Sequence, residues 1–175
     1  DVKARLMSTA TPGGDNSVYE QGAGRLDVGR AATSPIRVDA SKLEFGYLRW
    51  PHTDLAPITK ALTYTNDSDR PVTLELEVVG DATKAVSLSA TSLDLPAGGS
   101  AQVKVTAAVD DLDVGLYDGR IRATVSGSAP HVVTTPFGWY LEPERYDLTV
   151  RGIDRAGNPS QDCVVVSDVD DGAWA

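Results

Sequence analysis

The chain has 175 residues, of which 41% are hydrophobic and 23% charged, as is typical of a globular protein with one or two domains. Sixteen basic against twenty-five acidic side chains give a formal net charge of −9, which argues against nucleic acid and anionic membrane surfaces as partners. The only cysteine, Cys163, excludes an internal disulfide and a thiolate metal cluster, and no apolar run in the sequence is long enough to span a bilayer.

Two short helices are predicted at the start of the chain. In residues 1–10, Val2, Leu6 and Ala10 stand four positions apart on one face of the first helix. A glycine-punctuated turn in residues 21–32 leads into the second helix, which Asp27 can N-cap. Because a helix of about ten residues is marginal alone, we expect the face with Val2 and Leu6 to pack against a surface.

Beyond residue 37 the hydrophobic period becomes that of strands. Apolar residues alternate with polar ones along residues 72–78, 101–109 and 117–125, and weaker strands are predicted at 38–45, 58–65, 86–95 and 132–140. One-sided strands are typical of antiparallel sheets with one wet face. About seven of them, separated by regular turn signals, predict a mainly β fold: an immunoglobulin-like or fibronectin type III-like antiparallel sandwich with short N-terminal helices.

Tyr117 opens the sixth of these strands, within the sequence Gly-Leu-Tyr-Asp-Gly. Sandwiches of this kind often place a tyrosine there whose hydroxyl bonds to the backbone of the preceding corner. We therefore expect a structural role for Tyr117, with an exposed binding aromatic as the alternative.

The chain changes again after Pro143. Tyr146, Leu148 and Val150 alternate with polar residues, residues 154–159 predict a turn, and a second strand begins at Cys163. We expect a hairpin that starts a further β-domain, with Cys163 as a buried strand thiol, and a stiff linker at residues 142–144.

Several segments together resemble one known protein ending, that of the subtilisin-like serine peptidases, or subtilases. Residues 2–10 (VKARLMSTA) and 21–31 (QGAGRLDVGRA) are similar to the last helices of the subtilase catalytic domain. Four runs and a closing strand are similar to the fibronectin type III-like domain that follows it: LEFG (43–46), LTYTNDSDRPVTLELEV (62–78), LPAGGSAQVKV (95–105), GLYDG (115–119) and TPFG (135–138). The resemblance implies catalytic-domain helices at 1–34, a sandwich at 35–142 and the start of another β-domain at 143–175.

The resemblance implies a non-catalytic accessory segment of a secreted or cell-surface serine endopeptidase. The segment would brace or space the catalytic domain and aid access of protein substrates, which would be its partners. The family's serine lies in a "GTSMA"-type motif that this sequence lacks, so the chain is expected to have no Asp/His/Ser triad and to be no enzyme. The first helix, separated from its catalytic body, would dock on the flank of the sandwich or on a second copy as a homodimer.

The rival hypothesis is an adhesion module, in which the sandwich binds carbohydrate or protein. Exposed aromatics would then form the platform, and Trp50, Trp139, Tyr140 and Trp174 are the candidates. Trp139 and Tyr140 must point to opposite faces of a strand, so only one of them is free. We expect core or inter-domain packing for these aromatics.

We expect no catalytic, cofactor-binding or metal-binding residue. His52 and His131 follow prolines and are predicted to be solvated loop histidines. The sequence places no serine or cysteine where either histidine could activate it as a general base. The acidic clusters at residues 110–113 and 168–171 are expected to be solvated turns. A minor hypothesis is that one of them binds calcium, the only cofactor considered.

Overall fold

The computed structural model describes residues 1–14, 16–127 and 131–160 of the chain. The chain divides into two compact units, Asp1–Glu144 and Arg145–Ala175. The first unit holds both the residues assigned above to helices (1–34) and those assigned to the sandwich (35–142). Within the described ranges, no helix is long and apolar enough to cross a membrane.

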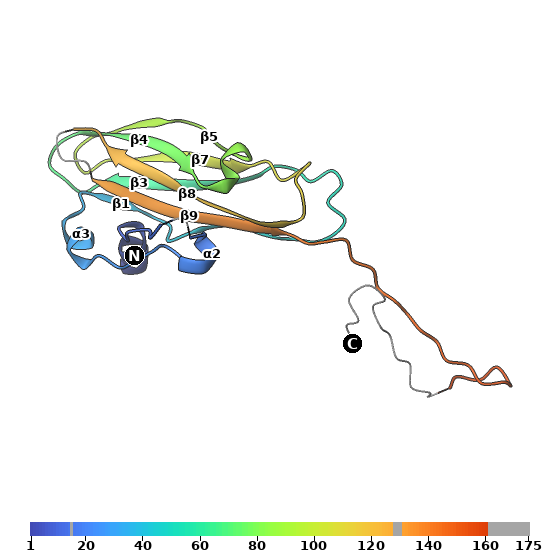
Figure 1. The fold of residues 1–175 in the computed structure, drawn as a ribbon. Helices are drawn as coiled ribbons and strands as arrows, with labels where there is room; N and C mark the ends of the chain where they lie inside the picture. Colours follow the sequence, from blue (N-terminus) through green and yellow to red (C-terminus); the bar gives the residue numbers. More distant parts are fainter. Residues whose placement is uncertain (15, 128–130, 161–175) are drawn as a thin grey trace. The chain divides into compact units, whose positions relative to one another are not determined.

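Two stacked sheets make up most of the first unit (Figure 1). The four-stranded sheet has the order β1 (Ile36–Val38), β3 (Ile58–Asn66), β7 (Ser100–Ala107) and β5 (Val86–Leu88). The five-stranded sheet has the order β2 (Leu43–Leu48), β9 (Val132–Leu141), β8 (Gly115–Val125), β4 (Val72–Val79) and β6 (Ser92–Leu95). Neighbouring strands are antiparallel except β2 and β9, which are parallel. The predicted immunoglobulin-like sandwich is confirmed.

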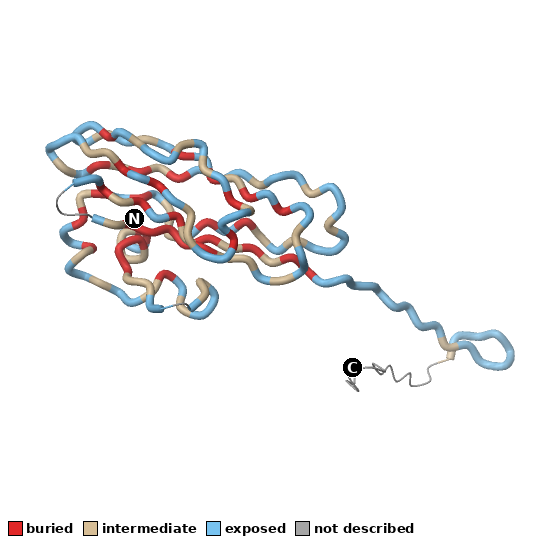
Figure 2. Tube along the Cα trace, turned by 45° about the horizontal axis from the view of Figure 1, so that its top comes forward, coloured by how far each residue is buried: buried red, intermediate tan, exposed pale blue. Residues whose placement is uncertain are grey.

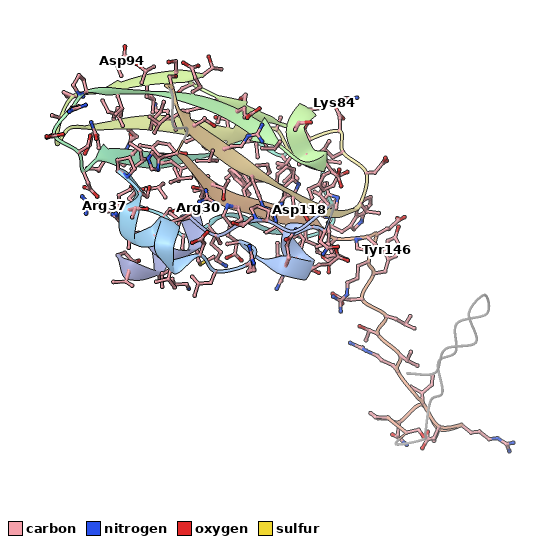
Figure 3. The ribbon with its side chains drawn as sticks, turned by 60° about the vertical axis from the view of Figure 1, so that its left-hand side comes forward. Arg30, Arg37, Lys84, Asp94, Asp118 and Tyr146 are labelled. Atoms are coloured by element: carbon pink, nitrogen blue, oxygen red, sulfur yellow. The ribbon has the colours of Figure 1, made fainter. Side chains whose placement is uncertain are left out.

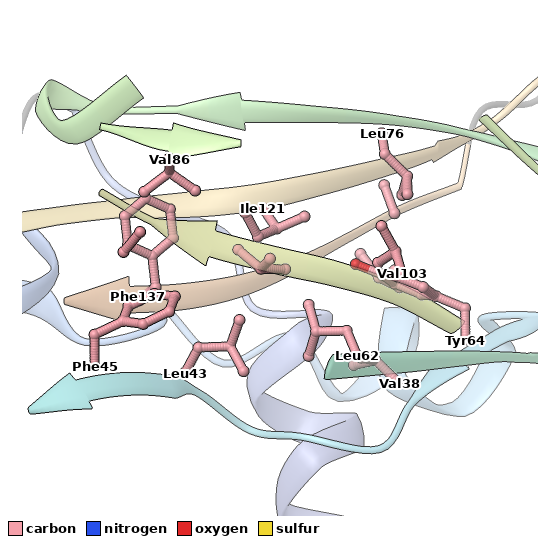
Figure 4. Packing of buried hydrophobic residues seen from close by; sticks show 14 of the residues in the cluster. Val38, Leu43, Phe45, Leu62, Tyr64, Leu76, Val86, Val103, Ile121 and Phe137 are labelled. Atoms are coloured by element: carbon pink, nitrogen blue, oxygen red, sulfur yellow. The ribbon is translucent and has the colours of Figure 1, made fainter. Parts of the chain in front are cut away.

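The apolar residues of the alternating pattern form the core between the sheets. Leu74 and Leu76 of β4 are buried, as are Val103 of β7 and Ile121 of β8. Figure 2 shows that buried positions recur along the strands. Figure 4 shows Phe137 in this core among aliphatic side chains from both sheets. Because a two-residue period places every second side chain on one face, this core follows directly from the predicted strands.

Two strands that we predicted as continuous each cross from one sheet to the other. Residues 38–45 were expected to form one strand, yet β1 ends at Val38 beside β3, and β2 begins at Leu43 beside β9. Residues 86–95 behave alike, since β5 pairs with β7 and β6 pairs with β4. Each lateral side of the sandwich is therefore closed by one segment that belongs to both layers, which shortens every exposed strand edge.

Three short helices lie against the sandwich: α1 (Val2–Ser8), α2 (Val18–Gln21) and α3 (Val28–Thr33). Asp27 caps α3 as predicted, because its side chain accepts a hydrogen bond from the backbone of Arg30. Helix α2 was not predicted. Its signal was the capping box of Ser17 and Glu20, which stands before too short an apolar run to be recognised.

The first helix docks on the flank of its own sandwich, beside β1 and β9 (Figure 1). The face that we predicted to pack is wrong at its start, because Val2 is 75% exposed and the helix buries Ala4 and Ser8 instead, whereas Ala10 of the predicted face is buried. Small side chains allow the helix backbone to approach the sheet closely. A pattern of large apolar residues therefore pointed to the wrong face of this helix.

The second unit is described only over residues 145–160. The strand predicted at residues 146–150 is absent from this part of the chain. The predicted turn is present: Asp154 Oδ1 accepts hydrogen bonds from the backbone of Ala156 and Asn158, both at 2.8 Å, and Ile153 bridges to Pro159. The predicted second strand with Cys163, the acidic cluster at 168–171 and Trp174 lie outside the described residues.

Candidate functional site

An apolar groove of about 400 Å³ lies on the outward face of the five-stranded sheet, between helices α1 and α2 and strands β2 and β9. A groove of this size is within the range that takes a small ligand or a few side chains of a partner. Most of its lining is apolar or aromatic: Met7, Val18, Tyr19, Leu43, Tyr47, Pro136, Phe137, Trp139 and Tyr140.

Gly138 of β9 makes room for Tyr19 on this face. A Cβ atom at Gly138 would lie 2.7 Å from the Tyr19 hydroxyl oxygen. That hydroxyl donates a hydrogen bond of 3.0 Å to the carbonyl oxygen of Trp139, so α2 is held on the sheet by its own tyrosine. Tyr19 still remains 49% exposed, and its ring forms one wall of the groove.

Three further side chains extend this wall in a row across the sheet. Tyr47 of β2 stands opposite Tyr140 of β9 with ring centroids 5.1 Å apart, and Leu116 of β8 stands opposite Tyr140 on the other side. The Tyr47 hydroxyl donates to the buried Glu142 carboxylate at 2.7 Å, which fixes the ring. Tyr47 is 54% and Leu116 60% exposed. We call Tyr19, Tyr47, Leu116 and Tyr140 the tyrosine surface.

Carboxylates give this surface a negative field. Burial raises the pKa of Tyr19, and the charges of Asp118 and Glu44 raise it further. Glu44 forms an exposed ion pair of 2.6 Å with Lys42, which lowers the pKa of that carboxyl. Asp118 accepts a hydrogen bond of 3.1 Å from the backbone of Val18, at the start of α2 (Figure 3).

The structural role predicted for Tyr117 is confirmed. Its hydroxyl donates a hydrogen bond of 2.8 Å to the carbonyl oxygen of Asp113, in the corner before β8. Its ring stacks on Trp139 with centroids 5.3 Å apart and planes 7° from parallel. The alternative of an exposed binding aromatic is therefore wrong for Tyr117.

The predicted aromatics divide between core and surface. Trp139 is 1% exposed, and the core position expected for it is confirmed. Core packing is wrong for Trp50, which is 37% exposed in the loop after β2 and lies edge to face with His52. Sequence reasoning considered Tyr140 but missed Tyr19 and Tyr47, because one lies in the unpredicted helix α2 and the other follows a strand switch.

The two histidines and the first acidic cluster do not converge on a reactive centre. His131 is exposed, and His52 is half-buried with its Nε2 3.0 Å from the carbonyl oxygen of Leu48. Residues 110–113 border a hollow together with Trp50 and His52. Among the residues that the structure describes, no three acidic, histidine or cysteine side chains are grouped to hold a metal ion, so the calcium hypothesis gains no support there.

No family model matches the sequence, and no curated protein matches it. Solved structures with a similar fold include the PapD-like domain 7 of human CEP192, at 12% identity and a TM-score of 0.50, covering 63% of this chain and 87% of that one. The E. coli chaperone DraB has 12% identity and a TM-score of 0.47 over 61% of this chain, and SSP-19, an MSP-domain-like protein of Caenorhabditis elegans, has 10% and 0.45 over 59%. The chain spans 54% of DraB and 97% of SSP-19.

These comparisons correct the resemblance to subtilases, which is wrong. Neither a family model nor a curated protein links the chain to those peptidases, and the similar structure with a TM-score of 0.50 is a PapD-like domain. The matching segments lie in helices α1 and α3 and in strands of both sheets, together with the turns between those strands. The bracing role inferred from the resemblance has no test here and stays a prediction.

Proposed function

We propose that the chain is a non-catalytic, protein-binding β-sandwich module that contacts its partner through the tyrosine surface. The observation that carries this proposal is the row of half-exposed tyrosines beside an apolar groove. Tyrosine is enriched at the centres of protein interfaces because it offers a large rigid ring together with a hydroxyl. Both Tyr19 and Tyr47 already have their hydroxyls engaged, so their rings are fixed before a partner arrives.

The partner fitted to this surface is a segment that combines apolar and basic side chains. The field of Asp118 and Glu44 at Tyr19 favours lysine or arginine at the rim, as does the net charge of −9. Addition of a strand to the β2 edge is disfavoured, because the register is interrupted between Glu44 and Gly46. The groove would instead receive side chains of the partner.

Selection of peptides displayed on phage against the full chain tests this proposal. We expect enriched peptides with an aromatic or large aliphatic residue flanked by lysine or arginine, and binding that weakens at least tenfold in Tyr140→Ala and Tyr19→Ala. Thr59→Ala, on the outer face of the opposite sheet, is the matched control and should bind as the wild type does. Failure to enrich peptides, or enrichment of peptides that ignore both tyrosine variants, would contradict it.

The proposal also bears on proteolysis and on location. We expect the chain to release no peptides from casein, because the module binds and does not cleave. We also propose that the protein is exported, and fractionation of the native cells tests this.

A further inference from the structure

A second hollow of about 560 Å³ lies on the same outward face, bordered by the segment that leads into α2, by β8 and by the turn between β4 and the 3₁₀ helix η1 (Asp81–Lys84). Unlike the groove, it is lined mainly by polar groups. Its polar side chains are Asn16, Ser17, Asp81, Asp118, Arg120, Arg122 and Thr134.

Two donors at this hollow are buried without a partner in the described structure. Thr134 is 7% exposed, and its Oγ1 forms no hydrogen bond with the residues described. The Nε of Arg120 is likewise buried without a described partner, although its Nη2 donates to the carbonyl oxygen of Gly22 at 3.2 Å. A buried donor left without an acceptor is destabilising, so two of them at one hollow point to an acceptor that the described residues do not supply.

The strand register explains why these groups meet. Arg122 of β8 stands opposite Thr134 of β9, and Arg120 stands opposite the next outward residue, Pro136. Their side chains therefore share the outward face, where Thr134 is buried and Arg120 half-buried, whereas Arg122 remains exposed. Desolvation lowers the pKa of Arg120, while the charge of Asp118 opposes that effect.

The described side chains that line the hollow carry charges of both signs. Two guanidinium groups, of Arg120 and Arg122, face two carboxylates, of Asp81 and Asp118. Arg122 also forms an ion pair with Glu77. The two carboxylates would repel a strongly anionic ligand, and the two arginines would repel a cationic one. A neutral ligand that carries several groups able both to donate and to accept hydrogen bonds suits all of them.

We propose that this hollow, the polar pocket, binds a neutral saccharide. Ring hydroxyl oxygens would accept hydrogen bonds from Arg120 Nε and Thr134 Oγ1, and neighbouring hydroxyls would donate to Asp81 or Asp118. The pocket volume lies within the range of small-ligand sites, and Pro12 and Val79 add apolar contact for the sugar ring. This inference does not rest on the tyrosine surface, which lies at the other side of α2.

Titration of the full chain with glucose, galactose, mannose, N-acetylglucosamine and glucuronate, followed by backbone amide NMR shifts, tests the proposal. We expect saturable shifts near Gly80, Arg120 and Thr134 with at least one neutral sugar, with a Kd of about 1 mM. Thr134→Val removes the hydroxyl at nearly constant volume, and Arg120→Met removes the guanidinium. Each should weaken that binding at least tenfold.

Stability measurements separate a ligand site from a structural one. Because Thr134→Val deletes an unpartnered buried hydroxyl, its melting temperature should equal or exceed that of the wild type even though sugar binding is lost. Thr124→Val in β8 and Arg37→Met in β1 are the matched controls and should leave the sugar shifts unchanged. The proposal is overturned if no neutral sugar gives saturable shifts, if glucuronate alone binds, or if both pocket variants bind as the wild type does.

Discussion

Tyr64 lies fully buried in the core of the sandwich, on β3. Burial raises the pKa of its hydroxyl far above the ordinary value of about 10, and the charge of Asp39 adds to this effect. The phenolate would have to be formed inside an apolar layer, where a charge is poorly solvated. This single residue therefore couples the stability of the whole fold to alkaline pH.

The sign of that coupling gives a prediction. Below about pH 10 the hydroxyl is protonated in both states and contributes no pH dependence; above it, only the unfolded state loses the proton, so the free energy of unfolding falls as pH rises. One such group contributes a slope of up to about 1.4 kcal/mol per pH unit. Denaturant unfolding between about pH 9 and pH 11.5 should show a smaller decline for Tyr64→Phe than for the wild type. Equal slopes would contradict the prediction.

Some residue roles followed from the sequence, and others did not. Tyr117 was predicted because its hydrogen bond closes a local corner, four residues away along the chain. Tyr19, Arg120 and Thr134 were missed because their roles depend on pairs that are distant in the sequence: Tyr19 bonds to β9, 120 positions away, and Arg120 to Gly22, 98 positions away. Local contacts leave a pattern in sequence, whereas the distant docking of one segment leaves none.

The same distinction holds for the strands. The alternation of β4, β7 and β8 predicted these elements well, because a one-sided strand has a visible period of two. The switches within residues 36–48 and 86–95 were missed. At each one the alternation changes phase, because Val38 is buried in β1 but Leu43 in β2, and Val86 is buried in β5 but Leu95 in β6. Which strand each half pairs with is visible only in the structure.

The helices are joined to the sandwich by a few polar contacts, of which Arg5 makes several. Its Nε and Nη2 donate to the carbonyl oxygens of Ala31 and Ser34 at 2.6 and 2.7 Å, and its Nη1 pairs with Asp67 at 3.0 Å. Asp67 also pairs with Arg37 of β1 at 2.9 Å. One guanidinium thus links α1 to the end of α3 and to the turn after β3.

We expect Arg5→Met to loosen these helices while it keeps most of the apolar stem. The loss of three hydrogen bonds to a charged donor should lower the free energy of unfolding by about 2 kcal/mol. Hydrogen exchange should then accelerate in residues 1–34 and stay unchanged in β7 and β8. Lys3→Met, an exposed change on the same helix, is the control, and equal exchange in both variants would contradict the role of Arg5.

At the scale of the whole molecule, the helices form a third layer over part of the five-stranded sheet. This layer covers part of β9, because Thr134 and Pro136 are buried although they point away from the core. Ala4, Ser8 and Ala10 on the helical side are buried as well. Both the groove and the polar pocket lie along the boundary of this layer, so the layer creates the candidate sites.

Removal of residues 1–33 should therefore expose apolar surface without dissolving the sandwich. The two sheets keep their own core, to which Leu62 of β3 contributes from one sheet and Ile121 of β8 from the other. We expect retained β-sheet circular dichroism, stronger binding of the dye ANS, and a melting temperature lower by roughly 5–10 °C. If removal of residues 1–33 changes neither dye binding nor melting, the helices are not a structural layer. The helical walls assigned to both candidate sites would then be wrong.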